Sequence, residues 1–348
     1  MTLKIIAEKA GVSVSTVSRV INGKSTKAAS KEVQENIFKI AREIGYTPNK
    51  FAQNLRQKPL SVSSSKILGC IFGRVSSSDN DPFFSILARS IEKEVIKKGY
   101  TMKYSFTSSE VSDENKVKGL LRDSHLDGVF VLGRLDKNYY DLIQKECRHM
   151  VYAGLNGISP LYDQVIVDGY QAAMTAVHYL YSLGHRNIGY IGEKSNETRY
   201  KGYYDALVEL DLSPDPINIF MTKLSADNGY TAAKRMLESS SSNATAFFCA
   251  NDLTAIGVIK ALNEYGLLIP QDISVIGIDD IETAQLISPS LTTIQIPLEE
   301  MGKVAAKLLL DRMEEGNYLP MKIELPFNLI VRDSTSTYSS KTKGDHYV

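Results

Sequence analysis

Residues 3–22 read LKIIAEKAGVSVSTVSRVIN, and this stretch decides how the chain is organised. Apolar residues at helical spacing predict a short helix from Leu3, and Gly11 can end it because glycine tolerates a left-handed backbone. Ser13 is a good N-cap for a second helix over residues 14–22. Two short helices joined by a glycine-containing turn are typical of a DNA-binding helix-turn-helix, although a plain surface hairpin is the alternative.

The second helix of this pair has two different faces. Its apolar face consists of Val14, Val17, Val20 and Ile21. The other face carries small hydrogen-bonding residues and one arginine, namely Ser15, Thr16, Ser18, Arg19 and Asn22. Such a polar face suits contacts with DNA.

The net charge is zero over the whole chain but is unevenly distributed. Residues 1–58 contain eleven Lys or Arg against four Asp or Glu, a balance of +7, so the remainder holds 29 basic against 36 acidic residues, or −7. A basic N-terminal module on an acidic body is the electrostatic pattern of a nucleic-acid reader fused to another domain. A solvated charged helix, the alternative, does not explain why the excess is confined to one end.

A third helix is predicted over residues 31–45, with Ser30 as its N-cap. Its apolar stripe completes a minimal three-helix headpiece. Residues 49–56 then have room for a helix that is too short to be stable alone in water, so we expect it to form only against DNA or a partner. The serine-rich residues 61–65 predict a linker.

From Lys66 onward, short apolar runs alternate with helical patterns. The runs that predict strands are KILGCIF (66–72), TMKYSF (101–106), DGVFVLG (127–133), HMVYAG (149–154), NIGYIG (187–192), TAFFCA (245–250) and ISVIGID (273–279). The helical patterns include 83–98, 112–123, 169–183, 196–210, 225–238 and 252–265. This alternation predicts an α/β fold with parallel sheets covered by helices on both faces, and the chain is long enough for two doubly wound lobes.

The composition disfavours several classes of protein. No apolar run is long enough for a membrane span, and the first residues lack the apolar core of a signal peptide, so we expect a cytoplasmic protein without a membrane partner. Cys70, Cys147 and Cys249 are isolated in apolar surroundings, which is typical of buried thiols. No phosphate-binding glycine motif follows a strand and no catalytic constellation is visible, so we expect no cofactor, no metal and no enzyme activity.

Further motifs resemble a known family. AGVSVSTVSRVING (10–23) and GYTPNKFAQNLR (45–56) resemble the headpiece and hinge of the lactose-repressor (galactose-repressor) family. The rest of the pattern is DPFF (81–84), SLGHRNIGYIG (182–192), TRYKGY (198–203), AND (250–252), IPQDISVIGIDD (269–280) and SPSLTTIQIP (288–297). The resemblance implies a dimeric transcription regulator whose core resembles periplasmic sugar-binding proteins, with two lobes, three crossovers and a ligand in the cleft.

The same resemblance implies which residues contact DNA. Val14, Ser15 and Arg19 match positions that face base edges, and an arginine can bridge O6 and N7 of guanine. For Val14, packing in the core is an equal alternative. The phosphate-contacting positions are matched by Ser13, Thr16, Ser18, Asn22 and Ser30, and the hinge positions by Asn49, Ala52 and Leu55. Leu55 matches a leucine that wedges into the minor groove, with packing against the core as its alternative.

In the cleft, Arg199, Asn251 and Asp279 match the family's polar ligand contacts. A guanidinium and a carboxylate can hold the neighbouring hydroxyls of a sugar by paired hydrogen bonds, so a small sugar effector is implied. A purely structural ion pair is the alternative for Arg199 and Asp279. Phe83 and Phe84 would form an apolar wall for a sugar ring, and core packing is equally compatible with their sequence.

Some positions depart from the family pattern. Val33 and Gln34 stand where the third helix commonly opens with a Thr-Arg pair, which predicts weaker or redistributed backbone contacts. Gly154 lacks an Asp found in some relatives, and Leu224 and Ile296 replace larger or polar cleft residues. The stretches DNDPFF, VLGRLD, YDQVIVD and LPMKIELP look most like members that respond to galactosides.

The predicted organisation is a DNA-binding headpiece (1–46), a hinge helix and linker (47–65), a two-lobed effector-binding and dimerisation core (66–333) and a disordered tail (334–348). We interpret the chain as a homodimeric repressor of a carbohydrate-utilisation operon that binds double-stranded operator DNA under the control of a small sugar effector. Dimer contacts are expected through Ile86, Leu87, Val258 and Leu262. The alternatives are control by a partner protein or a non-sugar ligand, a plain sugar-binding protein, and an enzyme acting on sugars.

Overall fold

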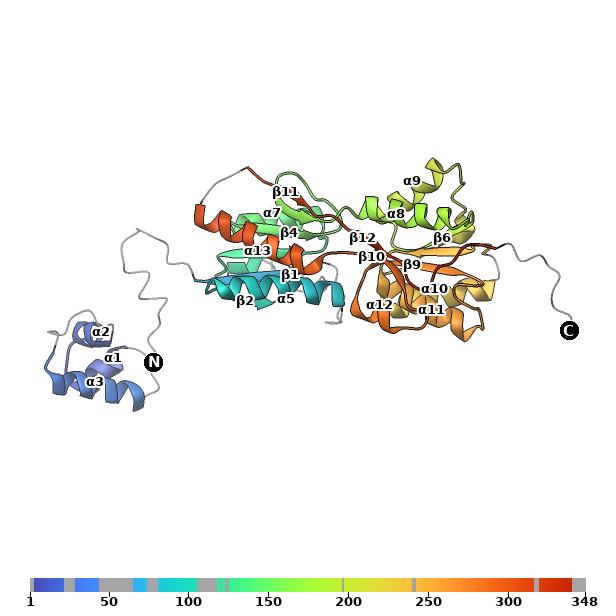
Figure 1. Cartoon of the computed structure of the whole chain (residues 1–348). Helices are drawn as coiled ribbons and strands as arrows, with labels where there is room; N and C mark the ends of the chain where they lie inside the picture. The colour runs from blue at the N-terminus through green and yellow to red at the C-terminus, as the bar shows by residue number, and fades with distance from the viewer. Residues whose placement is uncertain are drawn as a thin grey trace. The chain divides into compact units, whose positions relative to one another are not determined.

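The computed structural model describes residues 3–21, 29–43, 65–73, 81–104, 118–119, 121–122, 125–195, 197–239, 242–315 and 319–339. The chain divides into two compact units, Met1–Ser64 and Ser65–Val348 (Figure 1). Four of the predicted DNA-contacting residues lie outside the described residues, namely Asn22, Asn49, Ala52 and Leu55. Most of the predicted helix at 112–123 also lies outside them.

The first unit contains the three predicted helices, α1 (Leu3–Ala10), α2 (Val14–Ile21) and α3 (Lys31–Glu43). Gly11, between α1 and α2, has φ +64°, which is the left-handed conformation expected of a residue that ends a helix. The Ser13 Oγ accepts a hydrogen bond from the Thr16 amide at 3.1 Å, so Ser13 caps α2 as predicted. The Ser30 Oγ accepts from the Val33 amide at 3.4 Å at the start of α3.

A small apolar core holds these three helices together. Its buried members are Ile6, Ala7, Val17, Val20, Ile37, Ile40 and Ala41. Val14 is not among them, because 44% of its surface is exposed. The predicted apolar face of α2 is therefore wrong at its first residue, and core packing does not account for Val14.

The second unit contains two six-stranded sheets within its described residues. The sheet of the first lobe has the order β11 (Lys322–Glu324), β5 (Asp163–Ile166), β4 (Met150–Gly154), β3 (Gly128–Leu132), β1 (Ile67–Phe72), β2 (Thr101–Tyr104). The sheet of the second lobe has the order β12 (Asn328–Ile330), β10 (Thr292–Gln295), β9 (Ser274–Asp279), β8 (Ala246–Cys249), β6 (Ile188–Gly192), β7 (Ile219–Met221). All neighbouring strands run parallel except β10 and β12, so the predicted α/β fold with parallel sheets is confirmed.

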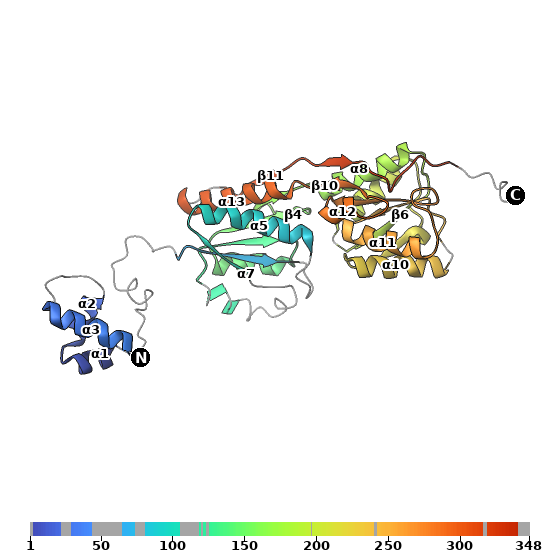
Figure 2. The ribbon, with the colours of Figure 1, turned by 60° about the horizontal axis from the view of Figure 1, so that its bottom comes forward.

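Helices cover both faces of each sheet (Figure 2). In the first lobe, α5 (Pro82–Lys97) and α13 (Leu298–Glu315) pack together on one face and α7 (Lys137–Glu146) covers the other. In the second lobe, α8 (Gly169–Ser182) packs with α9 (Thr198–Glu209), α10 (Ala226–Ser239) packs with α11 (Asp252–Glu264), and the short α12 (Glu282–Leu286) follows β9. None of the described helices has the length and apolar character needed to cross a membrane.

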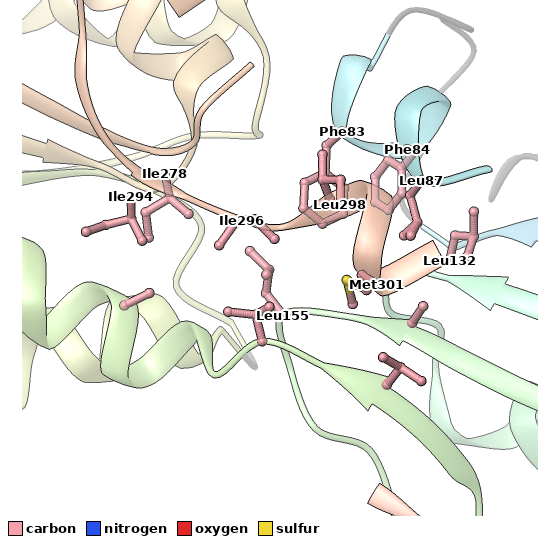
Figure 3. Packing of buried hydrophobic residues seen from close by; sticks show 14 of the residues in the cluster. Phe83, Phe84, Leu87, Leu132, Leu155, Ile278, Ile294, Ile296, Leu298 and Met301 are labelled. Carbon is pink, nitrogen blue, oxygen red and sulfur yellow. The ribbon is translucent and has the colours of Figure 1, made fainter. Parts of the chain in front are cut away.

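The chain passes between the lobes three times, from β5 to α8, from β10 to α13 and from β11 to β12. The three crossovers are therefore confirmed. One buried apolar cluster continues from the first lobe into the second and includes Leu155, Ile296 and Leu298 beside these passages (Figure 3). This shared core lies beneath the ends of the strands that carry the candidate site.

Two sequence-based expectations are wrong in the second unit. The tail predicted to be disordered is packed over its first residues, because the Ser334 side chain is buried, donates to the Val275 carbonyl at 2.6 Å and accepts from the Thr292 amide at 2.8 Å. Residues 340–348 lie outside the described residues. Three of the four side chains expected at a dimer contact, Leu87, Val258 and Leu262, are fully buried in the chain's own core, and Ile86 is partly buried.

Candidate effector cleft and DNA-contacting surface

A cleft of about 460 Å³ lies between the two lobes, where the carboxyl ends of the parallel strands meet. This edge is the usual ligand-binding position in open α/β sheets. All five predicted effector contacts line it: Phe83, Phe84, Arg199, Asn251 and Asp279. The first two belong to the first lobe and the other three to the second, so the structure brings together residues from distant parts of the sequence.

Asp279 is the last residue of β9 and has an unusual environment. Its φ is +132°, a conformation that side-chain-bearing residues rarely adopt, and the side chain is 4% exposed. Within the described chain, its Oδ1 has no hydrogen-bond partner. Burial is the main reason that the pKa of this carboxyl lies well above its ordinary value, and the nearby Asp252 raises it further. A buried acceptor without a partner is costly in a folded protein, and a ligand hydroxyl would satisfy it.

By contrast, Asp252 and Asp280, two acidic neighbours of Asp279, each accept hydrogen bonds at both carboxylate oxygens. Asp252 accepts hydrogen bonds from the Thr293 hydroxyl at 2.6 Å and from the Ile281 amide at 3.0 Å. Burial nevertheless raises its pKa to about 7. Asp280 accepts from Arg332 at 2.5 Å and from Gln295 at 2.8 Å. These contacts hold the two residues that follow Asp279, namely Asp280 and Ile281.

Arg199, in the first turn of α9, is buried and held by its own helix cap. Its Nε and Nη2 donate to the two carboxylate oxygens of Glu197 at 2.8 and 3.0 Å, and its Nη1 donates to the Ala250 carbonyl at 2.7 Å. Burial acts to lower the pKa of the guanidinium, but the Glu197 carboxylate more than offsets this, and the pKa lies above its ordinary value. The ion-pair partner of Arg199 is therefore Glu197, not Asp279 as the alternative proposed.

The other predicted contacts also have structural roles. Asn251 caps α11, because its Oδ1 accepts from the Thr254 amide at 3.0 Å. Phe83 and Phe84 pack edge to face with ring centroids 5.1 Å apart, and both belong to the buried core while lining the cleft (Figure 3). Core packing is therefore confirmed for both phenylalanines, and contact of their rings with a sugar stays a prediction.

The departures from the family pattern also have a place in the structure. Leu224 lines the cleft, whereas Ile296 belongs to the buried cluster. Gly154 also lines the cleft, and a Cβ there would collide with the Tyr152 hydroxyl. No larger side chain fits at this position unless the tyrosine moves.

Sequence reasoning missed several charged residues of the cleft. They are Asp81, Arg134, Asp136, Glu193, Lys223 and Asp227. Four of these lie within four residues of the end of a strand: Arg134 and Asp136 come after β3, Glu193 after β6 and Lys223 after β7. For Arg134, Asp136 and Glu193 the available signal was a position at the carboxyl end of a predicted strand. The strand before Lys223 was not predicted.

The charges that line the cleft are not balanced. The described lining residues include three bases, Arg134, Arg199 and Lys223. They also include five acids, Asp81, Asp136, Glu193, Asp227 and Asp279, which gives a balance of −2. Over the described ranges, no group of three or more His, Cys, Asp or Glu side chains is arranged to hold a metal ion.

In the first unit, hydroxyl groups gather at the N-terminus of α2. The Ser13 Oγ lies 2.7 Å from the Ser15 Oγ and 2.8 Å from the Thr16 Oγ1. A helix N-terminus carries a partial positive charge and free amides, so this cluster suits a phosphate. Ser15 and Arg19 are exposed on the same helix together with Val14, and Ser18 is partly buried. At α3, the Gln34 side chain donates to the Ala29 carbonyl at 2.8 Å.

Both units of the chain match known protein families. Residues 2–49 match the lacI family of bacterial regulatory proteins, and residues 177–335 match the periplasmic binding protein-like domain. The chain is 31% identical over 343 residues to the HTH-type transcriptional repressor MelR of Bacillus subtilis (strain 168), covering 95% of this chain and 96% of the relative. It is 31% identical over 350 residues to the HTH-type transcriptional repressor PurR of Haemophilus influenzae (strain PittEE), covering 97% and 99%.

Solved structures agree with this. The complex of the transcriptional regulator CelR with cellobiose has a TM-score of 0.71 and 26% identity, covering 96% of this chain and 99% of that one. The lac repressor dimer bound to operator and the anti-inducer ONPF has a TM-score of 0.70 and 26% identity, covering 97% and 99%. A LacI family regulator from Enterococcus faecium with bound ribose has a TM-score of 0.69 and 28% identity, covering 78% and 100%.

A helix-turn-helix unit joined to a two-lobed core with a ligand-sized cleft defines a DNA-binding transcriptional repressor with a ligand-binding core. The chain belongs to the lacI family of bacterial regulatory proteins. Members of this family bind operator DNA and small-molecule effectors and form dimers. The curated relatives are repressors rather than enzymes.

Proposed function

We propose that the chain represses a carbohydrate-utilisation operon and that a small sugar bound in the cleft controls its DNA binding. The observation that carries this proposal is the buried Asp279 Oδ1, which lines the cleft and has no partner within the described chain. The cellobiose and ribose bound by two regulators of similar structure support a sugar as the effector. The sequence stretches that look like galactoside-responsive members favour a galactoside within this class.

The cleft offers both kinds of hydrogen-bonding group that a sugar needs. Asp279 accepts from a sugar hydroxyl. Arg199 has five N–H groups, of which three donate to Glu197 and Ala250 within the described chain, so two can donate to hydroxyl oxygens. Phe83 and Phe84 offer an apolar surface to the sugar ring.

The charges of the cleft favour a neutral sugar over a phosphorylated one. The lining residues have a balance of −2, and phosphate recognition would require a cation that is free to pair with it. The Arg199 guanidinium already pairs with Glu197. Arg134 lies within ion-pair distance of Glu193 and Glu197. Lys223, the third base, is exposed, so solvent weakens its attraction for a phosphate. We therefore expect phosphorylated sugars to bind more weakly than their neutral parents.

The proposed DNA-contacting surface is the exposed face of α2. Val14, Ser15 and Arg19 would read base edges in the major groove. The hydroxyl cluster at the start of α2, with Ser18, Asn22 and Ser30, would contact phosphates and so position the helix. Asn49, Ala52 and Leu55 would contact the minor groove at the centre of a palindromic operator, which a homodimer recognises through two half-sites.

A thermal-shift screen of the full chain tests the effector. It compares galactose, melibiose, lactose, cellobiose, glucose and ribose with galactose 6-phosphate and glucose 6-phosphate. A sugar at 100 times its dissociation constant should stabilise the protein by about 2.7 kcal/mol. Asp279→Ala should abolish that shift, whereas Asp311→Ala, at an exposed position of α13 outside the cleft, should not. Stabilisation by none of the neutral sugars, or by the phosphates alone, would contradict the proposal.

A second candidate is control by a non-sugar ligand or by a partner protein. MelR and PurR are both 31% identical to this chain, so identity alone does not select an effector. An operator titration distinguishes the candidates. Release of operator by one of the neutral sugars supports sugar control, and release only by another small molecule or by a protein fraction supports the second candidate.

A further inference from the structure

Arg134 links the two lobes at the cleft. It lies in the loop after β3 of the first lobe, and its side chain is 16% exposed. Its Nη2 is 3.6 Å from Oε2 of Glu193 and 4.0 Å from Oε2 of Glu197. Glu193 follows β6 and Glu197 caps α9, so both carboxylates belong to the second lobe. One cation of the first lobe thus faces two anions of the second.

Both ends of this link are held by their own lobe. On the first lobe, the Leu135 amide donates to the Tyr140 hydroxyl at 2.8 Å, which fixes the loop next to Arg134. On the second lobe, Glu197 is buried and bound to Arg199 by two hydrogen bonds. Each side of the ion pair is therefore fixed to its own lobe. Because of this, a change in the distance between the lobes changes the distance between Arg134 and the two glutamates.

We propose that Arg134 is a positioning residue that ties the lobes together, favouring the arrangement in which both contact the effector. Ion pairs that are partly shielded from solvent are stronger than those at an open surface. When a neutral residue replaces Arg134, its attraction to the carboxylates of Glu193 and Glu197 is lost. The population of conformations then shifts toward those in which the lobes lie farther apart. Only the consequence for effector binding rests on the proposed function, because the link itself is testable without an effector.

Distances between spin labels on the two lobes test this inference in the full chain. Suitable sites are Lys145→Cys on α7 and Lys234→Cys on α10, which are exposed helical positions, one on each lobe (Figure 2). The native cysteines Cys70, Cys147 and Cys249 are buried, and burial raises the pKa of each thiol, so they should not take up label. Dilution with unlabelled protein suppresses distances between subunits.

Pulsed electron paramagnetic resonance would then compare matched variants. Arg134→Gln and Glu193→Gln should each broaden the distance distribution toward longer values, and the double variant should add little, because the two residues act as one pair. Arg134→Lys keeps the positive charge and should retain most of the short distances. Arg122→Gln is the control, because Arg122 pairs with Glu146 inside the first lobe and should leave the distribution unchanged. Unchanged distributions in Arg134→Gln and Glu193→Gln, or shifts that simply add, would overturn the proposal.

A sugar from the neutral set that binds the wild type gives the second readout. Its dissociation constant should rise about tenfold in Arg134→Gln, the equivalent of roughly 1.4 kcal/mol, and by much less in Arg134→Lys. An unchanged dissociation constant despite a changed distance distribution would overturn the link to effector binding. If no neutral sugar binds the wild type, the proposed function fails, while the label distances still decide the role of Arg134.

Discussion

Glu197 and Arg199 stand two residues apart on either side of the start of α9, and both oxygens of the Glu197 carboxylate accept from the Arg199 guanidinium. Both side chains are almost completely buried. A guanidinium at the base of a ligand cleft must remain charged and point in one direction, and the two-point contact ensures both. One buried carboxylate, that of Glu197, therefore positions the arginine, and another, that of Asp279, lines the cleft with an Oδ1 that has no partner within the described chain.

Glu197→Gln should lower the free energy of unfolding by about 3 kcal/mol, because it leaves a buried guanidinium without its counter-charge. Chemical denaturation of the full chain measures this. Glu209→Gln on the exposed part of the same helix is the matched control and should change stability by less than about 0.5 kcal/mol. Equal stability of the two variants would show that Arg199 does not depend on Glu197.

The TRYKGY motif (198–203) identifies Arg199 as a candidate ligand contact, but the sequence does not show which carboxylate pairs with it. Glu197 precedes the TRYKGY motif, and its residue type suggests no more than a helix cap, a role that it also has through the Arg199 amide at 3.2 Å. Which carboxylate a guanidinium binds depends on how its side chain rotates in the folded protein. Seven strands and five helices of the core could be located because they follow periodic patterns in the sequence. The order of the strands in each sheet depends on long-range pairing, which such patterns do not show.

The predictions for the C-terminal tail and for the dimer contact are wrong for a related reason: both concern residues that are buried in the folded chain. STSTYSS at 334–340 is polar, and polar composition predicted a disordered tail. Ser334 is nevertheless buried, since its hydroxyl and backbone satisfy groups of β9 and β10. The sequence does not show how wide an apolar stripe each sheet covers, and Leu87, Val258 and Leu262, which are expected at a dimer contact, are buried under that cover.

The packed tail leads to a prediction from two truncations. A chain ending at Asp333 should lose at least about 2 kcal/mol of stability, because the Val275 and Thr292 amides lose their partners. A chain ending at Ser339 keeps those contacts and should be as stable as the full chain. Thermal or chemical unfolding of both truncated chains checks this. Equal stability of the two would mean that residues 334–339 contribute nothing.

Asp252 should make stability depend on pH. Burial raises the pKa of its carboxyl to about 7 in the folded protein, above its value in the unfolded chain. The folded state therefore binds more protons between about pH 4 and pH 7, and this contribution to stability is present at low pH and lost as the pH rises through 7. The slope due to one such group is at most about 1.4 kcal/mol per pH unit.

Asp252→Asn isolates that contribution, because asparagine retains hydrogen-bonding groups for Thr293 and Ile281 without a charge. The difference in unfolding free energy between variant and wild type should grow in favour of the variant as the pH rises from 5 to 8. Denaturant titrations at four pH values measure it. A difference that is independent of pH would mean that Asp252 is ionised throughout this range.

On the DNA-contacting surface, Arg19→Ala should weaken binding to the specific operator by roughly 1–3 kcal/mol and relax the preference at one base pair in each half-site. The reason is that a bidentate contact with guanine is lost. Lys39→Ala, an equal change of charge at an exposed position of α3, is the control and should weaken binding to all sequences similarly. If Arg19→Ala also weakens all sequences equally, Arg19 contacts only phosphate.

In the proposed mechanism the switch depends on Asp279, and replacing this residue should separate function from stability. Most buried groups destabilise a protein when they are lost, but this carboxylate has an oxygen without a partner within the described chain and a backbone with φ +132°. Asp279→Asn should therefore leave the free energy of unfolding equal or higher, as expected where a binding site retains a costly group.

The same variant should lose the response to sugar, because a neutral amide replaces the carboxylate acceptor. Since linkage is reciprocal, a sugar that releases the operator and the operator itself should weaken each other's binding in the wild type by one common factor, typically 5–150-fold. In Asp279→Asn that factor should approach one while operator affinity without sugar stays unchanged, so the repressor remains bound. Operator titrations with and without saturating sugar measure both quantities, and a variant that releases the operator normally would place the effector site elsewhere.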